Sequence, residues 1–441
     1  MLIQNALIVT MNERNEVIDK GAIAIDGKRI VYVGPAEWTP AGPFDKVVDA
    51  GRMIAMPGMV NAHCHSPANL VRGMMPSKPL EIWRVYYRAS LRDMRDEDFY
   101  ASALLGGLEM LGNGATTVLD HFAGNQDCRF MGAGAAIQAM RDLGLRHIAA
   151  LTLTDKNYEE TIPLGNTKSS LNDEIKRMSA SESRSTQAWL DDCEAFIEAF
   201  HAPEKLTTAC PGPSAVQRCS DELLTKSAAM ARKRKLPMHI HLAETKAQAV
   251  MGRQIYGTSL LKHLDAIGVL DSNLSLAHSI WIDDDDVELF ARRGATPVHN
   301  PASNLRIGSG LAPVKRFLAS GVNVALGTDG SASNDGQNMF DAMRLAALIH
   351  NQAGTDFNQW VTPVQALAMA TRNGAGAFGL DAGMLAPGKL ADIVLLRRDT
   401  PAFTPLNDPM AQLVFCENGS GVDSVIVNGE VVVENGCSTK V

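Results

Sequence analysis

Two histidines stand two positions apart at the end of an apolar run, MIAMPGMVNAHCH, which closes with His63 and His65. Side chains on a β-strand alternate between its two faces, so residues two apart point to the same side. Two imidazole rings placed together in an apolar interior need a shared partner, and a divalent metal ion can serve both. The pair alone is ambiguous, because each ring could instead be a core histidine with its own hydrogen bonds.

Polar side chains also end several later apolar runs. The sequences HIHLAET, LAHS and LGTDGS place His241, His278 and Asp329 at such ends, and Glu244 follows three residues after His241. The carboxyl ends of the strands in a parallel barrel meet at one face, so these groups can converge with the first histidine pair. Separate structural roles would require each buried polar group to find its own partner. We therefore predict one metal site with catalytic groups beside it.

An alternation of β-type runs and helix-like stretches positions these residues, from about Met56 to Gly383. The runs include ATTVLD, HIAALTL, PMHIHL and LSLAH, and stretches such as DEDFYASALLGGLEMLGNG lie between them. This pattern predicts an α/β protein with a (β/α)8 TIM-type barrel and an outer ring of helices. An open, doubly wound sheet is the alternative.

Both ends of the chain read as short strands with polar turns. The N-terminal part contains LIQNALIVT, and the C-terminal part contains VDSVIVNGEVVVENG with an Asn-Gly hairpin turn. Neither end has enough alternating apolar residues for a core of its own. We therefore predict that residues 1–55 and 384–441 form one composite β-sandwich domain, into which the barrel of residues 56–383 is inserted.

Composition excludes several classes of protein. With 441 residues, 46% of them hydrophobic, and a net charge of -8, the chain can bury a large core and lacks the basic surface that nucleic acid or an anionic membrane requires. No stretch has the ~18 uncharged apolar residues of a membrane span, and we expect a cytoplasmic protein. The seven cysteines form no C-x-x-C pair, which predicts free thiols. We expect a small-molecule substrate and a homo-oligomer, a dimer or larger.

Residues 155–185 form a long, polar segment after the third β-type run. In a barrel this segment would overhang the face that carries the active site. It is either an ordered lid or a loop without a role, and the sequence leaves both interpretations open.

Six stretches together resemble the amidohydrolase superfamily, within it the branch of S-adenosylhomocysteine deaminases, guanine and 8-oxoguanine deaminases and triazine hydrolases. They are PGMVNAHCHSPANLVRG, HIHLAET, LAHS, HNPASNLRIGSGLAPV, GTDGSASND and PGKLADIVLL, and they span almost the whole chain. The resemblance implies a (β/α)8 barrel with a β-sandwich built from both termini, in agreement with the alternation of elements.

The resemblance also implies roles for single residues. The metal ligands would be His63, His65, His241 and Asp329. The catalytic groups would be Glu244, His278 and Asp329. A metal with an open position lowers the pKa of bound water toward ~7 and supplies hydroxide at neutral pH, and Glu244 can then transfer the proton to a ring nitrogen.

One divalent metal is expected, zinc or else iron. Members with two metals carry a carboxylated lysine at the carboxyl end of the fourth strand, but Lys205 stands at the wrong end of KLTTACPGPS. Lys156, after the third run, is the other nearby lysine. His239, two residues before His241, is expected to be a hydrogen-bonded neighbour of the site and not a ligand.

Five residues are predicted to contact the substrate: Trp83, Arg88, His121, Gln217 and Asn304. Trp83 offers a flat stacking surface, Arg88 offers donors, and Gln217 can read the edge of a ring. His121 and Asn304 are expected near the mouth of the barrel. Ordinary helix packing is the alternative for the aromatic residues, since Trp83 is spaced i, i+3 and i+4 from two tyrosines.

Two departures from the family pattern bear on the substrate. S-adenosylhomocysteine and methylthioadenosine deaminases usually carry a ribose-binding glutamate after the tryptophan of the first loop, and this chain has none there. They also carry a histidine where this chain has Ser214. We therefore predict a hydrolytic deaminase of a small nitrogen-rich heterocycle or amidine-like compound, acting on carbon–nitrogen bonds other than peptide bonds.

Three other functions stay open. The chain could be a triazine-type hydrolase that displaces chloride or an alkylamine, or it could deaminate S-adenosylhomocysteine or methylthioadenosine. A scaffold without catalysis is disfavoured, because a scaffold would be free to lose Glu244 or Asp329 and both are present.

Overall fold

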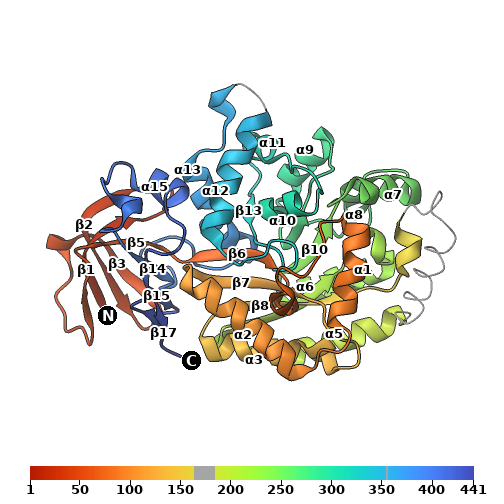
Figure 1. The fold of residues 1–441 in the computed structure, drawn as a ribbon, viewed down its shortest axis with the longest axis horizontal. Coiled ribbons are helices and arrows are strands. Elements are labelled where there is room, and N and C mark those ends of the chain that lie inside the picture. Colours follow the sequence, from red (N-terminus) through yellow and green to blue (C-terminus); the bar gives the residue numbers. More distant parts are fainter. Residues whose placement is uncertain (163–183, 354–355) are drawn as a thin grey trace.

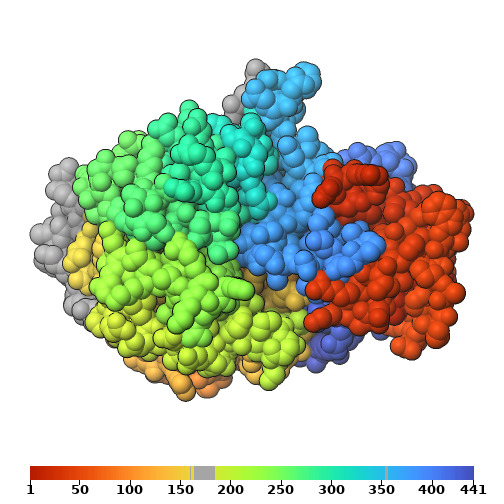
Figure 2. Space-filling view, turned by 180° about the vertical axis from the view of Figure 1, so that it is seen from behind, coloured from red at the N-terminus to blue at the C-terminus, as the bar shows by residue number. Residues whose placement is uncertain are grey.

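The computed structural model describes residues 1–162, 184–353 and 356–441. Strands from both ends of the chain lie at one end of the molecule, and the alternating helices and strands make up the rest (Figure 1). Figure 2 shows the same grouping from behind, with the N-terminal segments packed against C-terminal ones. Within the described residues, no helix is long and apolar enough to cross a bilayer. The expected cytoplasmic location and homo-oligomer stay predictions.

The two ends of the chain form one nine-stranded sheet. Strands β14 and β5 pair in antiparallel fashion and join the C-terminal strands to the N-terminal ones. Buried isoleucines such as Ile3, Ile23 and Ile393 supply the core of this part. The strands are β1 (Leu2–Val9), β2 (Val17–Asp26), β3 (Arg29–Pro35), β4 (Val47–Asp49), β5 (Met53–Pro57), β14 (Ile393–Arg397), β15 (Val422–Val427), β16 (Glu430–Glu434) and β17 (Cys437–Ser438).

Eight further strands form two four-stranded parallel sheets. The first contains β6 (Met59–Cys64), β7 (Ala115–Phe122), β8 (Arg146–Leu153) and β9 (Thr207–Pro213). The second contains β10 (Met238–Leu242), β11 (Leu274–His278), β12 (Thr296–His299) and β13 (Ala325–Leu326). Parallel neighbours require crossover connections, which the helices provide. The α/β class with parallel strands is confirmed, whereas closure into a barrel and the domain boundaries stay predictions.

The helices follow the predicted alternation. They are α1 (Leu80–Leu91), α2 (Asp96–Gly112), α3 (Ala133–Leu143), α5 (Thr186–Phe200), α6 (Asp221–Arg234), α7 (Lys246–Tyr256), α8 (Leu260–Ala266), α9 (Asp284–Arg293), α10 (Pro301–Arg306), α11 (Val314–Ala319), α12 (Met339–Ile349), α13 (Pro363–Ala370), α14 (Arg372–Ala377) and α15 (Pro409–Phe415). Polar N-caps begin several of them, because a side-chain oxygen satisfies a free backbone N–H. Thr245 Oγ1 accepts from Gln248 N at 3.3 Å and so begins α7 directly after Glu244.

The apolar run that leads to His63 is two strands, not one. β5 belongs to the terminal sheet and β6 to the parallel sheet, with Gly58 between them. A Cβ on Gly58 would lie 2.2 Å from Thr116 Oγ1, so the close packing of β6 on β7 requires glycine here. The chain passes from one sheet to the other at this residue.

Candidate active site

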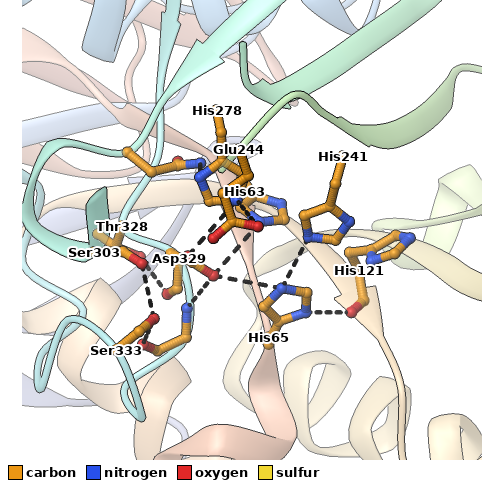
Figure 3. Close-up of polar contacts among 12 residues, drawn as sticks. His63, His65, His121, His241, Glu244, His278, Ser303, Thr328, Asp329 and Ser333 are labelled. Atoms are coloured by element: carbon orange, nitrogen blue, oxygen red, sulfur yellow. Dashed lines mark hydrogen bonds and ion pairs between the residues drawn. The ribbon is translucent and has the colours of Figure 1, made fainter. Parts of the chain in front are cut away.

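Polar side chains from the ends of the parallel strands point toward one centre (Figure 3). His63 and His65 come from β6, His241 from β10 and His278 from β11, and Asp329 follows β13. Asp329 Oδ1 lies 3.4 Å from His65 Nε2 and 3.5 Å from His63 Nε2. His65 Nε2 and His241 Nε2 are 3.3 Å apart. The sequence prediction that these residues converge is therefore correct as geometry.

Oxygen acceptors orient three of the four rings. His65 Nδ1 donates to the His121 carbonyl oxygen at 2.6 Å, and His241 Nδ1 donates to that of Ser214 at 2.6 Å. His278 Nδ1 lies 2.8 Å from Asn304 Oδ1. A proton held on Nδ1 by an oxygen leaves Nε2 with a lone pair that faces the centre. These three rings therefore have the orientation of metal-binding histidines, with Nε2 toward the centre.

The donors fit one divalent metal ion. Ligand atoms of His63, His65 and His241 lie within 4.8 Å of one another, as do those of His63, His278 and Asp329. His63 Nε2 is buried and has no well-formed hydrogen bond within the described part of the chain. Imidazole and carboxylate ligands suit zinc and iron. Lys156 Nζ lies 3.3 Å from Tyr256 Oη.

Asp329 is held in an unusual backbone conformation. Its φ of 62° is left-handed, which is uncommon for a residue other than glycine and is often found at functional sites. The backbone N–H of Asp329 donates to the His63 carbonyl oxygen at 2.9 Å. Its carboxylate accepts from Gly330 N at 2.8 Å and from Ser303 Oγ at 2.6 Å. These bonds fix the carboxylate against the histidines.

The two carboxyl groups of the site differ in the direction in which their pKa is shifted. Burial raises the pKa of Glu244 well above its usual value, and the negative charges of Asp329 and Glu81 raise it further. Burial also acts to raise the pKa of Asp329, but the hydrogen bond with His63 and the charge interactions with His63, His278 and His65 together outweigh it, so the pKa is well below its usual value. Glu244 Oε2 lies 3.7 Å from His278 Nε2. The pKa values of the two carboxyl groups are therefore shifted in opposite directions.

A cavity of about 1140 Å³, its open mouth included, leads to this centre. Four of the predicted substrate residues line it: Trp83, Arg88, His121 and Gln217. His121 Nε2 donates to the Gly212 carbonyl oxygen at 2.8 Å, which anchors the ring in the wall. Asn304 is not among the lining residues, because it lies behind His278 and accepts its Nδ1–H.

Two residues that line the cavity, Glu81 and Tyr158, are not among the five predicted substrate contacts. Glu81 lines the cavity two positions before Trp83, and its Oε1 accepts from Thr245 Oγ1 at 2.6 Å. Tyr158 lies under the guanidinium groups of Arg84 and Arg218, at 4.4 and 5.0 Å from its ring centroid. An acid in the same segment as Trp83 was the available signal for Glu81. Of the polar segment 155–185, for which the sequence left a lid and a loop without a role open, residues 163–183 lie outside the described residues.

Known proteins resemble this chain over nearly its whole length. The sequence model of the Amidohydrolase family matches residues 54–432. The chain belongs to the amidohydrolase family. This amidohydrolase is 37% identical over 444 residues to the 5-methylthioadenosine/S-adenosylhomocysteine deaminase of Moorella thermoacetica, covering 99% of this chain and 94% of that one. It is 34% identical over 420 residues to the 5'-deoxyadenosine deaminase of Methanothermobacter thermautotrophicus, covering 95% and 90%.

Solved structures give the same assignment. The amidohydrolase superposes on atrazine chlorohydrolase TrzN from Arthrobacter aurescens TC1, complexed with zinc, with a TM-score of 0.87 and 28% identity over 99% of this chain and 96% of that one. An adenosine deaminase from Xanthomonas campestris with bound zinc gives a TM-score of 0.84 and 25% identity, over 100% and 94%. The predicted family is confirmed, and the prediction of a hydrolase of carbon–nitrogen bonds agrees with the deaminases among its relatives.

Proposed function

We propose that this amidohydrolase is a metal-dependent hydrolytic deaminase that replaces the exocyclic amino group of a nitrogen-rich heterocycle with oxygen. The observation that carries the proposal is the position of Glu244. A carboxyl group with a raised pKa lies beside His278, next to a metal-type donor set, at the inner end of a cavity. This arrangement suits proton transfer during hydrolysis.

His63, His65, His241 and Asp329 would hold one divalent metal, zinc or else iron. Such an ion would lower the pKa of coordinated water toward ~7 and make a nucleophile available at neutral pH. Zinc in two related structures supports this choice. The left-handed backbone at Asp329 and its bonds from Ser303 and Gly330 would keep the carboxylate in place.

Glu244 carries the proton steps. It takes a proton from the attacking water and passes it to a ring nitrogen, while a carbon–oxygen bond forms at the amino-bearing carbon. The proton of the new hydroxyl group then passes to the amino group, the carbon–nitrogen bond breaks, and ammonia leaves a carbonyl group behind. Burial lowers the pKa of His278, so the neutral ring, held by Asn304, orients the nucleophile without competing for the proton.

An adenine nucleoside with a modified 5' position is the first substrate candidate. The full-length relatives named for 5'-deoxyadenosine, 5-methylthioadenosine and S-adenosylhomocysteine support it. Glu81 lines the cavity and offers a carboxylate that can accept from sugar hydroxyls. Glu81 removes one of the two grounds on which the sequence disfavoured a nucleoside.

A free planar heterocycle is the second candidate. Ser214 stands in the cavity wall where nucleoside deaminases of this branch carry a histidine, and Gln217 Oε1 is buried without a hydrogen bond among the described residues. An amide oxygen without a partner can read the donor edge of a ring. The two candidates share the same chemistry and differ in what fills the outer cavity.

We also propose that the two parallel sheets are the halves of one (β/α)8 barrel. An isolated parallel bridge between Ala215 and His241 links the end of β9 to β10. The hydrogen bond from Asp329 N to the His63 carbonyl oxygen links the segment after β13 to β6. Residues 1–55 and 384–441 would form the accompanying β-sandwich domain, and residues 56–383 the barrel.

Substitution of Glu244 tests the proposed chemistry. Glu244→Gln should keep about one equivalent of metal and lose on the order of 100- to 10,000-fold in kcat, because it removes proton transfer and no ligand. Asp329→Asn should lose the bound metal in addition to the turnover. Glu288→Gln, at an exposed position of α9, is the matched control. Near-normal turnover of Glu244→Gln would remove this residue from the mechanism, and loss of its metal would make it a ligand. Two equivalents of metal in the active protein would refute the single-metal site.

A further inference from the structure

We infer that His239 is a positioning residue, which together with Ser275 sets the side of the His63 ring that carries the proton. This inference rests on the proposed metal site. His239 lies on β10, two residues before His241, and both His239 and His63 are fully buried. Its Nε2 is 2.9 Å from His63 Nδ1. This contact determines whether His63 Nε2 presents a lone pair or a proton to a metal ion.

His63 differs from the other three rings in the type of neighbour at Nδ1. His65 and His241 face carbonyl oxygens, and His278 faces the Asn304 amide oxygen. An oxygen of this kind only accepts, so it fixes the proton on Nδ1. The nitrogen of a neutral imidazole can either donate or accept. The direct neighbour of His63 therefore does not fix the proton by itself, and something beyond His239 must do so.

Ser275 provides that further contact. His239 Nδ1 lies 2.7 Å from Ser275 Oγ, and Ser275 Oγ lies 3.4 Å from the Met238 carbonyl oxygen. When the hydroxyl donates to this carbonyl, its oxygen accepts from His239 Nδ1–H. His239 Nε2 is then an acceptor and receives the proton of His63 Nδ1. The opposite direction would place a proton on His63 Nε2, against the metal.

The sheet register builds this chain of contacts. His239 and Ser275 are paired across the parallel strands β10 and β11. His239 and His241 share one face of β10, so the same strand supplies one ligand and the support of another. Strand pairing alone places His239 beside Ser275, so no additional loop or helix is needed to support His63.

Zinc affinity of single variants tests the inference. His239→Leu removes the acceptor and should weaken zinc binding about 10- to 100-fold, the usual effect of losing a group that orients a ligand. His239→Gln should stay within a few-fold of the unmodified protein, because Gln Oε1 can accept from His63 Nδ1. Ser275→Ala should weaken binding in the same direction as His239→Leu. The affinity is measured by competition with a chromogenic chelator, starting from metal-free protein.

Two further measurements distinguish a role of His239 in orienting His63 from a role in packing the core. The melting temperature of each metal-free variant reports folding, and the visible absorption of the cobalt-loaded protein reports the ligand geometry. His350→Leu, a buried histidine outside both ligand groups, should bind zinc normally. Equal affinity of His239→Leu and the unmodified protein would overturn the inference, as would equal losses in His239→Leu and His239→Gln. Absence of zinc binding by the unmodified protein would instead overturn the proposed function.

Discussion

At the scale of residues, Glu244 and Asp329 show how one site gives two carboxyl groups opposite tasks. Burial penalises the charge of both. Burial acts to raise the pKa of Asp329, but the hydrogen bond with His63 and the charge interactions with His63, His278 and His65 lower it well below its usual value. The pKa of Glu244 is raised by burial and, further, by the nearby negative charges of Asp329 and Glu81. The difference in pKa follows from neighbours that other parts of the chain supply.

The buried histidines His299 and His350 make the free energy of unfolding depend on pH. Burial lowers the pKa of His350 to about 4, and its Nε2 lies 3.0 Å from His299 Nε2. As the pH falls, His350 binds a proton near pH 6.5 in the unfolded chain but only near pH 4 in the folded protein. The stabilisation of the folded protein that is present above pH 6.5 is therefore lost as the pH falls toward 4.

In chelator-treated protein we therefore expect the free energy of unfolding to fall between pH 6.5 and 4, by at most about 1.4 kcal/mol per pH unit from this residue. His350→Leu should show a shallower fall in urea titrations at each pH. Identical slopes for the two proteins would show that His350 does not contribute.

The sequence predicted the inner residues of the site better than the outer ones. His63, His65, His241, His278 and Asp329 could be found because each ends a strand, and strand ends meet. Asn304 was expected near the mouth, but it lies on the short helix α10, whose direction the sequence does not fix. Glu81 was not among the predicted substrate contacts, because the ribose-binding acid of the family pattern follows Trp83.

At the scale of elements, the helices and strands were largely predictable, but their partners were not. The stretch DEDFYASALLGGLEMLGNG, for example, contains α2 (Asp96–Gly112). The run before His63 contains two strands in different sheets, since only the three-dimensional contact of Gly58 with Thr116 marks the boundary. Apolar runs predict burial and leave the choice of sheet open.

Tyr158 joins three elements at the cavity. Its Oη donates to the Glu81 carbonyl oxygen of α1 at 3.1 Å, and its ring lies beside Arg84 of α1 and Arg218 of η6 (Val216–Arg218). Tyr158→Leu removes these contacts and loosens the outer wall without touching the ligand groups. We expect KM to rise about tenfold, as a loss of about 1.4 kcal/mol predicts, with kcat changed only a few-fold.

Steady-state kinetics of Tyr158→Leu should be compared with Tyr100→Leu, which changes a tyrosine of α2 that contacts Asp142. A large fall in kcat at constant KM would contradict the wall role of Tyr158. It would place this residue closer to the reacting atoms.

At the scale of the whole molecule, a buried ion pair joins the terminal sheet to the parallel strands. Arg146 Nη2 of β8 lies 3.1 Å from both carboxylate oxygens of Asp392, and Asp392 Oδ1 also accepts from Asn428 N at 2.7 Å. Asp392 is 1% exposed. Removing one partner of such a pair leaves an unpaired buried charge. The pair therefore couples the two ends of the chain to the site-bearing part.

We expect Asp392→Ala to lose about 3 to 5 kcal/mol of stability in urea unfolding, because Arg146 is left buried without its partner. The double variant Arg146→Met, Asp392→Leu should recover most of this loss. A loss below about 1 kcal/mol in the single variant would show that the pair is solvated.

Ammonia release is the most direct test of metal-dependent deamination by this protein. Zinc-loaded and chelator-stripped protein should be assayed side by side on 5'-deoxyadenosine, 5-methylthioadenosine, S-adenosylhomocysteine, adenosine, 8-oxoguanine and an aminotriazine. We predict one ammonia per product molecule, only with the metal-loaded protein, and the highest kcat/KM for a nucleoside with a modified 5' position. A free ring as the best substrate would favour the second candidate. No ammonia from any of these compounds, or equal release by the stripped protein, would contradict metal-dependent deamination.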